Sequence, residues 1–148
     1  DIEKRISEEL YDGLKENYQP KKGEVLFTKD GTIGISFALH KDTEAIVSGA
    51  FLRLKPKAKL DIDYLALVLN SLYCKYQIER MSGGAIIAHL KPDNVKKIKI
   101  PILSEKKQQE LAEKVLSSLR LRTEAKNLLE KTRDVAGLKK LEKMRKPR

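Results

Sequence analysis

The sequence has little of the chemistry that enzymes and metal sites require. It contains one cysteine, Cys74, and two histidines, His40 and His89, among 148 residues. A single cysteine excludes an internal disulfide bond and fits a reducing, cytoplasmic location. These three side chains cannot complete a four-ligand zinc site, and no Ser–His–Asp set or activated nucleophile can be assigned. We therefore expect no catalytic residues, no metal ligands and no cofactor bound by the chain itself.

Aromatic residues and long hydrophobic runs are also scarce. Three Phe, five Tyr and no Trp offer few rings on which single-stranded bases can stack, so a nucleic-acid partner is expected to be double-stranded. The longest purely apolar run, Leu65–Leu69, is far too short to span a bilayer. We accordingly expect no membrane partner.

Positive charge is abundant but unevenly distributed. The chain has 31 Lys and Arg against 21 Asp and Glu, a net charge of +10, which favours a polyanionic partner, with nucleic acid ahead of an anionic membrane or an acidic protein. A lysine-rich protein of thermophilic type, without such a partner, is the alternative. Residues 1–103 carry only +3, whereas residues 104–148 carry +7, of which +5 lies in 138–148. A basic patch on the first part must therefore come from spatial arrangement.

The first sixty residues predict a short helix followed by three strands. Ser7 is placed to cap the helix and Gly13 to end it. Stretches rich in β-branched and aromatic residues predict strands over 24–29, 34–40 and 45–56.

The motif "KDGTIG" lies between the first two predicted strands. It lacks the lysine–Ser/Thr ending of a P-loop and the third glycine of a dinucleotide fingerprint, and a strand follows it rather than a helix. We interpret it as a tight hairpin turn in which Gly31 takes a positive φ and Gly34 allows close backbone approach. Asp30 is interpreted as a turn residue. Lys29 and Thr32 stay candidates for phosphate contact.

Residues 61–81 predict one continuous helix that begins at Asp61 or Asp63. Its apolar residues form two stripes on nearly opposite sides, so the helix is expected to lie between two layers. The stripes are Leu65, Val68, Leu69, Leu72 and Tyr76 on one side, and Leu67, Cys74, Ile78 and Met81 on the other. A turn at Pro92 and an extended edge piece over 98–102 are expected to follow.

From Ser104 to Asp134 the sequence has no Gly or Pro and is dominated by strong helix formers. These 31 residues would form a helix of ~46 Å at ~1.5 Å per residue. The 103 residues before it cannot cover that length, so much of the helix is expected to project. The imperfect apolar repeat favours pairing with an antiparallel or separate helix over a parallel zipper. The predicted seam consists of Leu111, Val115, Leu128 and Leu129, and for the first two the alternative is packing on the chain's own core.

Together these elements predict an α+β fold with three parts. Residues 1–103 form a small mixed β-sheet body packed on a helix. Residues 104–137 form a long, coiled-coil-type spacer and dimerisation helix. Residues 138–148 form a basic tail.

Four segments follow one another in a specific order: "KKGEVLFTKDGTIG", "AIVSGAFLRLKPK", "DYLALVLNS" and "LKPDNVKKIKIPILSEKKQQELAEKV". They combine an apolar run into "DGTIG", a helix, an "IKIP" strand end and a long glutamine-led helix. This combination resembles the specificity subunit of type I restriction–modification systems over roughly residues 6–135. The stretch "GGAIIAHL" departs from the glycine–glutamine stretch usual before the "IKIP" strand.

The resemblance implies a DNA-reading and scaffolding role without catalysis. In that family a target-recognition domain reads one half of a split sequence in double-stranded DNA. Its long helix acts as a spacer that packs against a second helix and docks the methyltransferase (modification) subunits. Catalysis, S-adenosylmethionine, Mg and ATP belong to the modification and restriction subunits. The chain resembles the C-terminal part of one recognition domain with one spacer helix, either as a fragment or as a half-subunit that pairs with a second copy.

The candidate DNA-binding residues lie on predicted loops and strand ends, where Lys and Arg reach phosphates and a few side chains reach base edges. They are Lys29, Thr32, Arg53, Lys55, Arg80, His89 and Lys91. For each of them a solvated surface position without a ligand is the alternative. Two other functions stay open: a non-specific basic RNA- or ribosome-associated protein that binds through its tail, and a coiled-coil adaptor that binds only protein.

Overall fold

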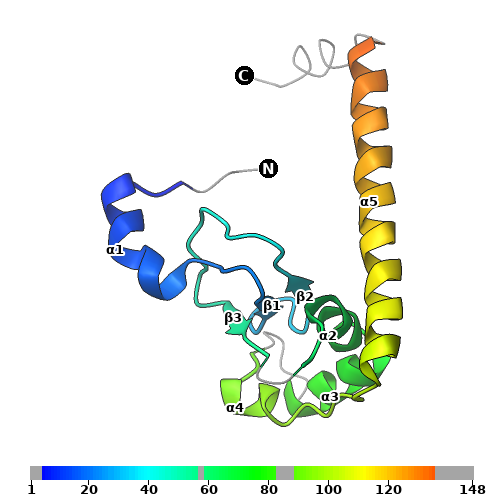
Figure 1. The fold of residues 1–148 in the computed structure, drawn as a ribbon. Coiled ribbons are helices and arrows are strands. Elements are labelled where there is room, and N and C mark those ends of the chain that lie inside the picture. The colour runs from blue at the N-terminus through cyan, green and yellow to red at the C-terminus, as the bar shows by residue number, and fades with distance from the viewer. Residues whose placement is uncertain (1–4, 57–58, 83–88, 136–148) are drawn as a thin grey trace. The chain divides into compact units, whose positions relative to one another are not determined.

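A computed structural model describes residues 5–56, 59–82 and 89–135 of the chain. The chain divides into two compact units, Asp1–Ala112 and Glu113–Arg148. The first contains a three-stranded antiparallel sheet with its helices, and the second contains most of one long helix (Figure 1). The predicted α+β class is confirmed. Within the described ranges, no helix is both long enough and apolar enough to cross a bilayer.

Strand β1 (Val25–Thr28) is the central strand of the sheet. It pairs in antiparallel fashion with β2 (Ser36–Ala38) on one side and with β3 (Phe51–Leu54) on the other. The three predicted strands are therefore present, but the third is much shorter than 45–56. Its first half is replaced by a turn, in which the Phe51 amide donates to the Ser48 carbonyl at 3.1 Å.

The turn between β1 and β2 has the predicted glycine conformations. Gly31 and Gly34 have φ values of 70° and 81°. The Thr28 hydroxyl fixes the turn, since it donates to the Thr32 carbonyl at 2.6 Å and accepts from the Ile35 amide at 2.9 Å. Gly34 also provides the expected close approach, because a Cβ added there would lie 2.8 Å from the Cδ1 atom of Ile78.

The prediction of one continuous helix over 61–81 is wrong, because the structure has two helices there: α2 (Ile62–Leu69) and α3 (Leu72–Ser82). Asn70 and Ser71 separate the two helices, because their side chains donate hydrogen bonds to nearby backbone carbonyls. The Asn70 amide donates to the Ala66 carbonyl at 2.8 Å, and the Ser71 hydroxyl donates to the Val68 carbonyl at 2.6 Å.

The break changes which side chains are buried. Leu72 and Tyr76, which were predicted to continue the α2 stripe, are 67% and 61% exposed. Cys74 and Ile78 of α3 instead enter the core. The helical region is therefore not one helix with two apolar sides.

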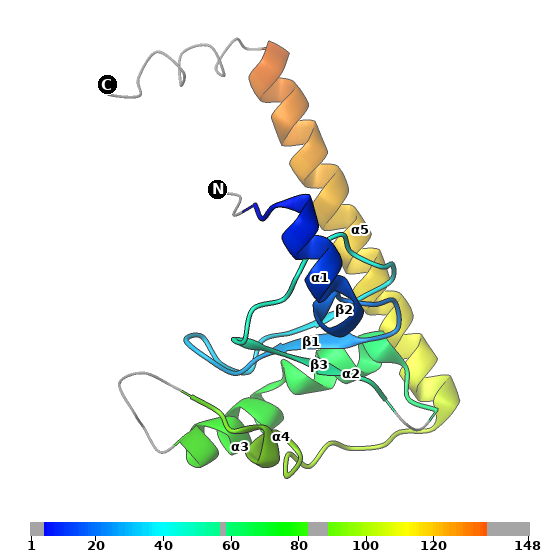
Figure 2. The same ribbon diagram turned by 90° about the vertical axis from the view of Figure 1, so that its left-hand side faces the viewer.

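The core of the first unit lies between the sheet and α2, which packs on β1 and β2 (Figure 2). Asp61 begins α2, as predicted, because its carboxylate accepts from the Asp63 and Tyr64 amides at 2.9 Å. The side chains with the least exposure are Val25, Phe27, Tyr64, Cys74 and Leu90.

Helix α1 (Glu8–Tyr18) begins at the predicted cap, where the Ser7 hydroxyl accepts from the Leu10 amide at 3.3 Å. It does not end at Gly13. A glycine inside a helix costs only about 1 kcal/mol relative to alanine, and the helix continues until Pro20 forces the preceding residue out of helical geometry.

The segment between the sheet body and the long helix differs from expectation. A short helix, α4 (Pro92–Val95), replaces the predicted turn, and residues 98–102 form no strand. Side chains satisfy the backbone of this segment instead of a neighbouring strand. The Gln77 side chain donates to the Lys99 carbonyl and accepts from the Lys99 amide, both at 2.9 Å. The Tyr64 hydroxyl donates to the Pro101 carbonyl at 2.8 Å.

The two turn glycines allow a matched test of the hairpin. Gly31→Ala should lower the free energy of unfolding by about 1 kcal/mol, because alanine is strained at positive φ. Gly34→Ala should cost roughly 1 kcal/mol more, because the new methyl group also meets buried Ile78. Urea denaturation of both variants measures the difference, and equal losses would contradict the close approach at Gly34.

Candidate nucleic-acid interface

The tip of the β1–β2 hairpin is joined to residues that follow much later in the sequence. Asp30 and His89, 59 positions apart, form an isolated antiparallel bridge, and the Leu90 amide donates to the Lys29 carbonyl at 2.8 Å. Leu90 is fully buried, which fixes this junction to the core. We call the residues Lys29–Thr32 and His89–Lys91 the hairpin surface. It brings together four of the predicted residues: Lys29, Thr32, His89 and Lys91.

Asp30 organises the charged groups of the hairpin surface. Its carboxylate bonds the Lys29 ammonium at 2.6 Å and the Nδ1 atom of His89. The Lys29 ammonium, followed by His89, holds the pKa of Asp30 below its usual value. Asp30 is therefore more than the turn residue that the sequence indicated. Thr32 and Lys91 are exposed beside this cluster.

Arg53 is directed to a different partner. Its guanidinium makes two bonds of 2.9 Å to the Glu24 carboxylate and a third to the Asn17 carbonyl. Glu24 is buried, and the bonds from Arg53 are the main reason that its pKa lies below the usual value. The structure thus gives Arg53 a role in holding α1 and β3 to β1, while the DNA contact proposed for it from the sequence stays a prediction.

Lys55 and Arg80 are exposed but stand apart from this cluster. Lys55 directly follows β3, and Arg80 lies in the last turn of α3. Among the described residues, no hydrogen bond or ion pair joins either side chain to the hairpin surface. The glycine loop after Arg80 and the motif departure over 83–88 lie outside the described residues.

Helix α5 (Glu105–Val135) begins one residue after the predicted start, and the predicted end at residue 137 lies outside the described residues. Of the predicted seam residues, Leu111 is half-buried and packs against the core of the first unit, as the alternative interpretation held. Val115 is half-buried, whereas Leu128 and Leu129 are 57% and 67% exposed. The tail over 138–148 lies outside the described residues.

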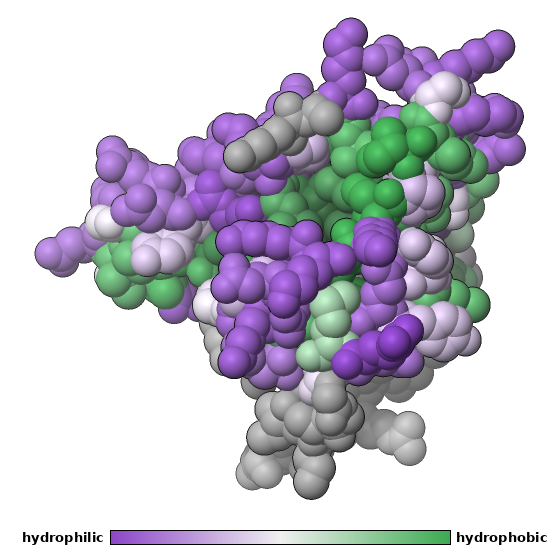
Figure 3. All heavy atoms as spheres, turned by 90° about the horizontal axis from the view of Figure 1, so that it is seen from below, coloured by the Kyte–Doolittle hydropathy of each residue, from purple (hydrophilic) through white to green (hydrophobic). Residues whose placement is uncertain are grey.

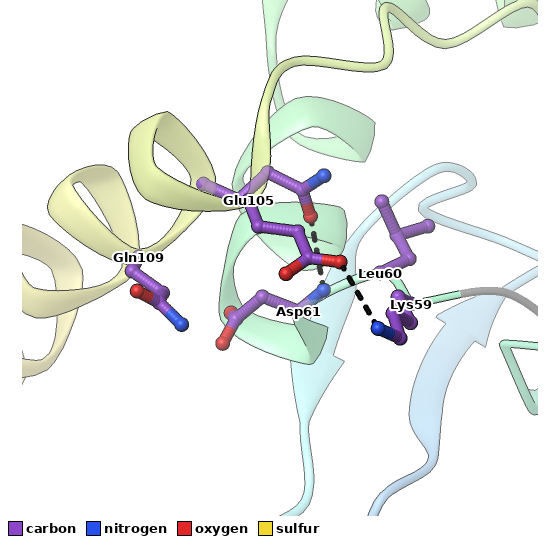
Figure 4. Close-up of a pocket in the computed structure, with 6 residues that line it drawn as sticks. Lys59, Leu60, Asp61, Glu105 and Gln109 are labelled. Atoms are coloured by element: carbon purple, nitrogen blue, oxygen red, sulfur yellow. Dashed lines mark hydrogen bonds and ion pairs between the residues drawn. The ribbon is translucent and has the colours of Figure 1, made fainter.

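A cavity of about 340 Å³ lies where α5 begins (Figure 4). Gln108 is buried beside it, and both ends of its amide are bonded: the oxygen accepts from the Asp61 amide at 3.1 Å, and the nitrogen donates to the Leu103 carbonyl at 2.8 Å. Lys59 and Glu105 form a 3.7 Å ion pair at its rim. Because its buried amide is already satisfied, the cavity marks a structural junction more than a ligand site.

The chemically reactive side chains have structural partners. The Nε2 atom of His40 lies 3.0 Å from the carboxylate of buried Asp63. Cys74 is buried, and burial raises the pKa of its thiol, which disfavours the nucleophilic thiolate. No group of three or more potential metal ligands occurs within the described ranges.

Two comparisons relate the chain to known proteins. A family model described as "Type I restriction modification DNA specificity domain" matches residues 3–131. A Haemophilus influenzae protein named "Putative type I restriction enzyme specificity subunit" is 30% identical over 109 residues, which are 72% of this chain and 27% of that protein. The chain thus spans about a quarter of the length of this curated relative.

The Glu24–Arg53 pair predicts a pH-dependent contribution to stability. Because the folded-state pKa of Glu24 is lowered, the pair stabilises the fold above the unfolded pKa of about 4.3 and loses this effect as the pH falls through the folded value. Glu24→Gln should cost about 2 kcal/mol at neutral pH, and the difference from wild type should shrink below about pH 4.

Denaturant unfolding at several pH values measures this difference. Asp93→Asn is the matched control, because the pKa of Asp93 is also lowered, by Lys96, but both side chains are exposed and solvent screens the pair. A loss for Glu24→Gln that is the same at acidic and neutral pH would contradict the assignment.

Proposed function

The chain belongs to the type I restriction modification DNA specificity domain family, and from this premise we propose that its first unit binds double-stranded DNA as part of a target-recognition domain. The observation that carries the proposal is the hairpin surface. It places two lysines, a histidine and a threonine together, although they come from segments distant in the sequence. No catalytic role is assigned to the chain itself.

The side chains of the hairpin surface suit two kinds of DNA contact. Exposed Lys91 is positioned to neutralise a phosphate, which supplies affinity but no sequence preference, whereas the Lys29 side chain is 17% exposed and its ammonium is paired with Asp30. Thr32 and His89 are short polar groups beside them and are suited to base edges in a groove. Asp30 keeps Lys29 and His89 close together, so phosphate and base contacts are made from one rigid turn.

The second unit is proposed to act as the spacer. Exposed leucines on α5, including Leu121, Leu128 and Leu129, favour pairing with a second helix, either from a second copy or from another part of a longer polypeptide. The paired helices would dock modification and restriction subunits. S-adenosylmethionine, Mg and ATP are proposed to bind to those subunits. The cytoplasmic location stays a prediction.

The net charge of +5 in residues 138–148 favours a second candidate function, non-specific binding through the tail. Deletion of these residues separates the two, with selection from a randomised duplex library as the assay. We expect the truncated chain to enrich a defined sequence. Loss of all DNA binding on deletion would favour the tail, and helix-mediated dimerisation without salt-dependent DNA binding would favour the adaptor.

The hairpin surface predicts a specific loss on removal of one lysine. Lys91→Ala should weaken duplex binding and lower the slope of log affinity against log salt by about one. Lys22→Ala is the matched control, because Lys22 is exposed near the opposite end of β1. Fluorescence anisotropy over a series of salt concentrations measures both. Equal effects of the two substitutions would argue against a localised surface.

The spacer proposal predicts a face-specific effect on α5. Leu128→Glu should weaken helix-mediated association at least about tenfold, because a charge would be buried at the interface. Thr123→Glu adds the same acid at an exposed position that lies about 120° to 160° around the helix from Leu121, Leu128 and Leu129, and it should change association little. Sedimentation velocity gives the mass of each variant. A wild-type chain that stays monomeric alone and with the modification subunit would contradict the proposal.

A further inference from the structure

The two edges of the sheet differ in how their backbone groups are satisfied. On the β2 edge, the Asn70 side chain takes the place of a neighbouring strand. Its oxygen accepts from the Ser36 amide at 3.0 Å, and its nitrogen donates to the Ser36 carbonyl at 2.8 Å. A side-chain amide has the same donor and acceptor as a peptide group, so this edge is closed to further pairing at Ser36.

The β3 edge has no such closure at its centre. The Lys29 amide donates to the Ala50 carbonyl at 2.8 Å, so Ala50, Leu52 and Leu54 direct their backbone groups toward β1. Phe51 and Arg53 therefore direct theirs outward. The Phe51 amide bonds the Ser48 carbonyl, whereas the Arg53 amide and carbonyl have no backbone partner within the described ranges.

An apolar hollow of about 330 Å³ lies beside this open edge. Its walls include Leu52 and Leu54 of β3, Leu65 and Leu69 of α2, and Ile98 and Ile100 of the segment before α5. Figure 3, the view from below, shows hydrophobic side chains gathered among hydrophilic ones on the face that carries α3 and α4. An open strand edge and an apolar hollow together suit an added strand, because its backbone would pair while alternate side chains fill the hollow.

We propose that β3 binds an extended segment of a partner protein in which apolar and acidic residues alternate. The residue opposite Arg53 exchanges two backbone hydrogen bonds with it and points its side chain to the Arg53 face of the sheet. The residues on either side point to the opposite face, over Leu52 and Leu54, and enter the hollow. Exposed Lys55 comes two residues after Arg53 and so lies on the same face, which favours acidic residues in the partner on that face. This inference does not depend on DNA binding.

The test uses the whole chain and a capped peptide of alternating valine and glutamate. Hydrogen exchange of the Arg53 backbone amide, measured by NMR, should slow at least about tenfold at saturating peptide, because the amide becomes hydrogen-bonded. The same peptide with its glutamates N-methylated should give no slowing, because those residues would face Arg53 and could no longer donate. This comparison requires no change in the protein.

A pair of variants tests the hollow. Ile98→Glu places a charge in its wall and should abolish peptide binding, whereas Leu72→Glu changes an exposed leucine on α3 and should retain it. Equal protection by the methylated peptide, or none by either peptide, would overturn the proposal. Protection that rises with protein concentration without peptide would also overturn it, since the edge would then pair with a second copy.

Discussion

The structure of the first unit depends on the burial of Leu90 beside the end of β1. Val25, Phe27 and Leu90 are all fully buried. The hydrogen bond from the Leu90 amide to the Lys29 carbonyl continues the backbone pairing of β1 one residue past its end at Thr28. The hydrophobic gain from burying such side chains offsets the entropy lost in bringing residues 30 and 89 together. The hairpin surface depends on this closure.

In residues 1–103, the spatial arrangement of charged side chains matters more than their net charge. Residues 1–103 carry a net charge of only +3, and part of their positive charge is used internally, as in the Arg53–Glu24 pair. The Lys29 charge is shared with Asp30. The DNA contact that we propose for the hairpin surface would therefore depend more on orientation and hydrogen bonding than on a strong electrostatic field.

Local chemistry made several elements predictable. The glycine turn, the caps at Ser7 and Asp61, and the long helix each depend on residues close together in the sequence. Part of what the sequence did not predict depends on distant partners. Asn70, which separates α2 from α3 through a local bond to Ala66, also bonds Ser36, 34 residues earlier, and Arg53 pairs with Glu24, 29 residues earlier. The link from Asp30 to His89 spans 59 residues, so no local pattern could reveal it.

The central claim is that the hairpin surface contacts duplex DNA. NMR titration of the isotope-labelled chain with a duplex tests it most directly, because each backbone amide reports its own surroundings. The account predicts that the amides of residues 29–32 and 89–91 shift first and in proportion to occupancy. Shifts confined to residues 138–148, with the hairpin surface unchanged at saturation, would contradict it.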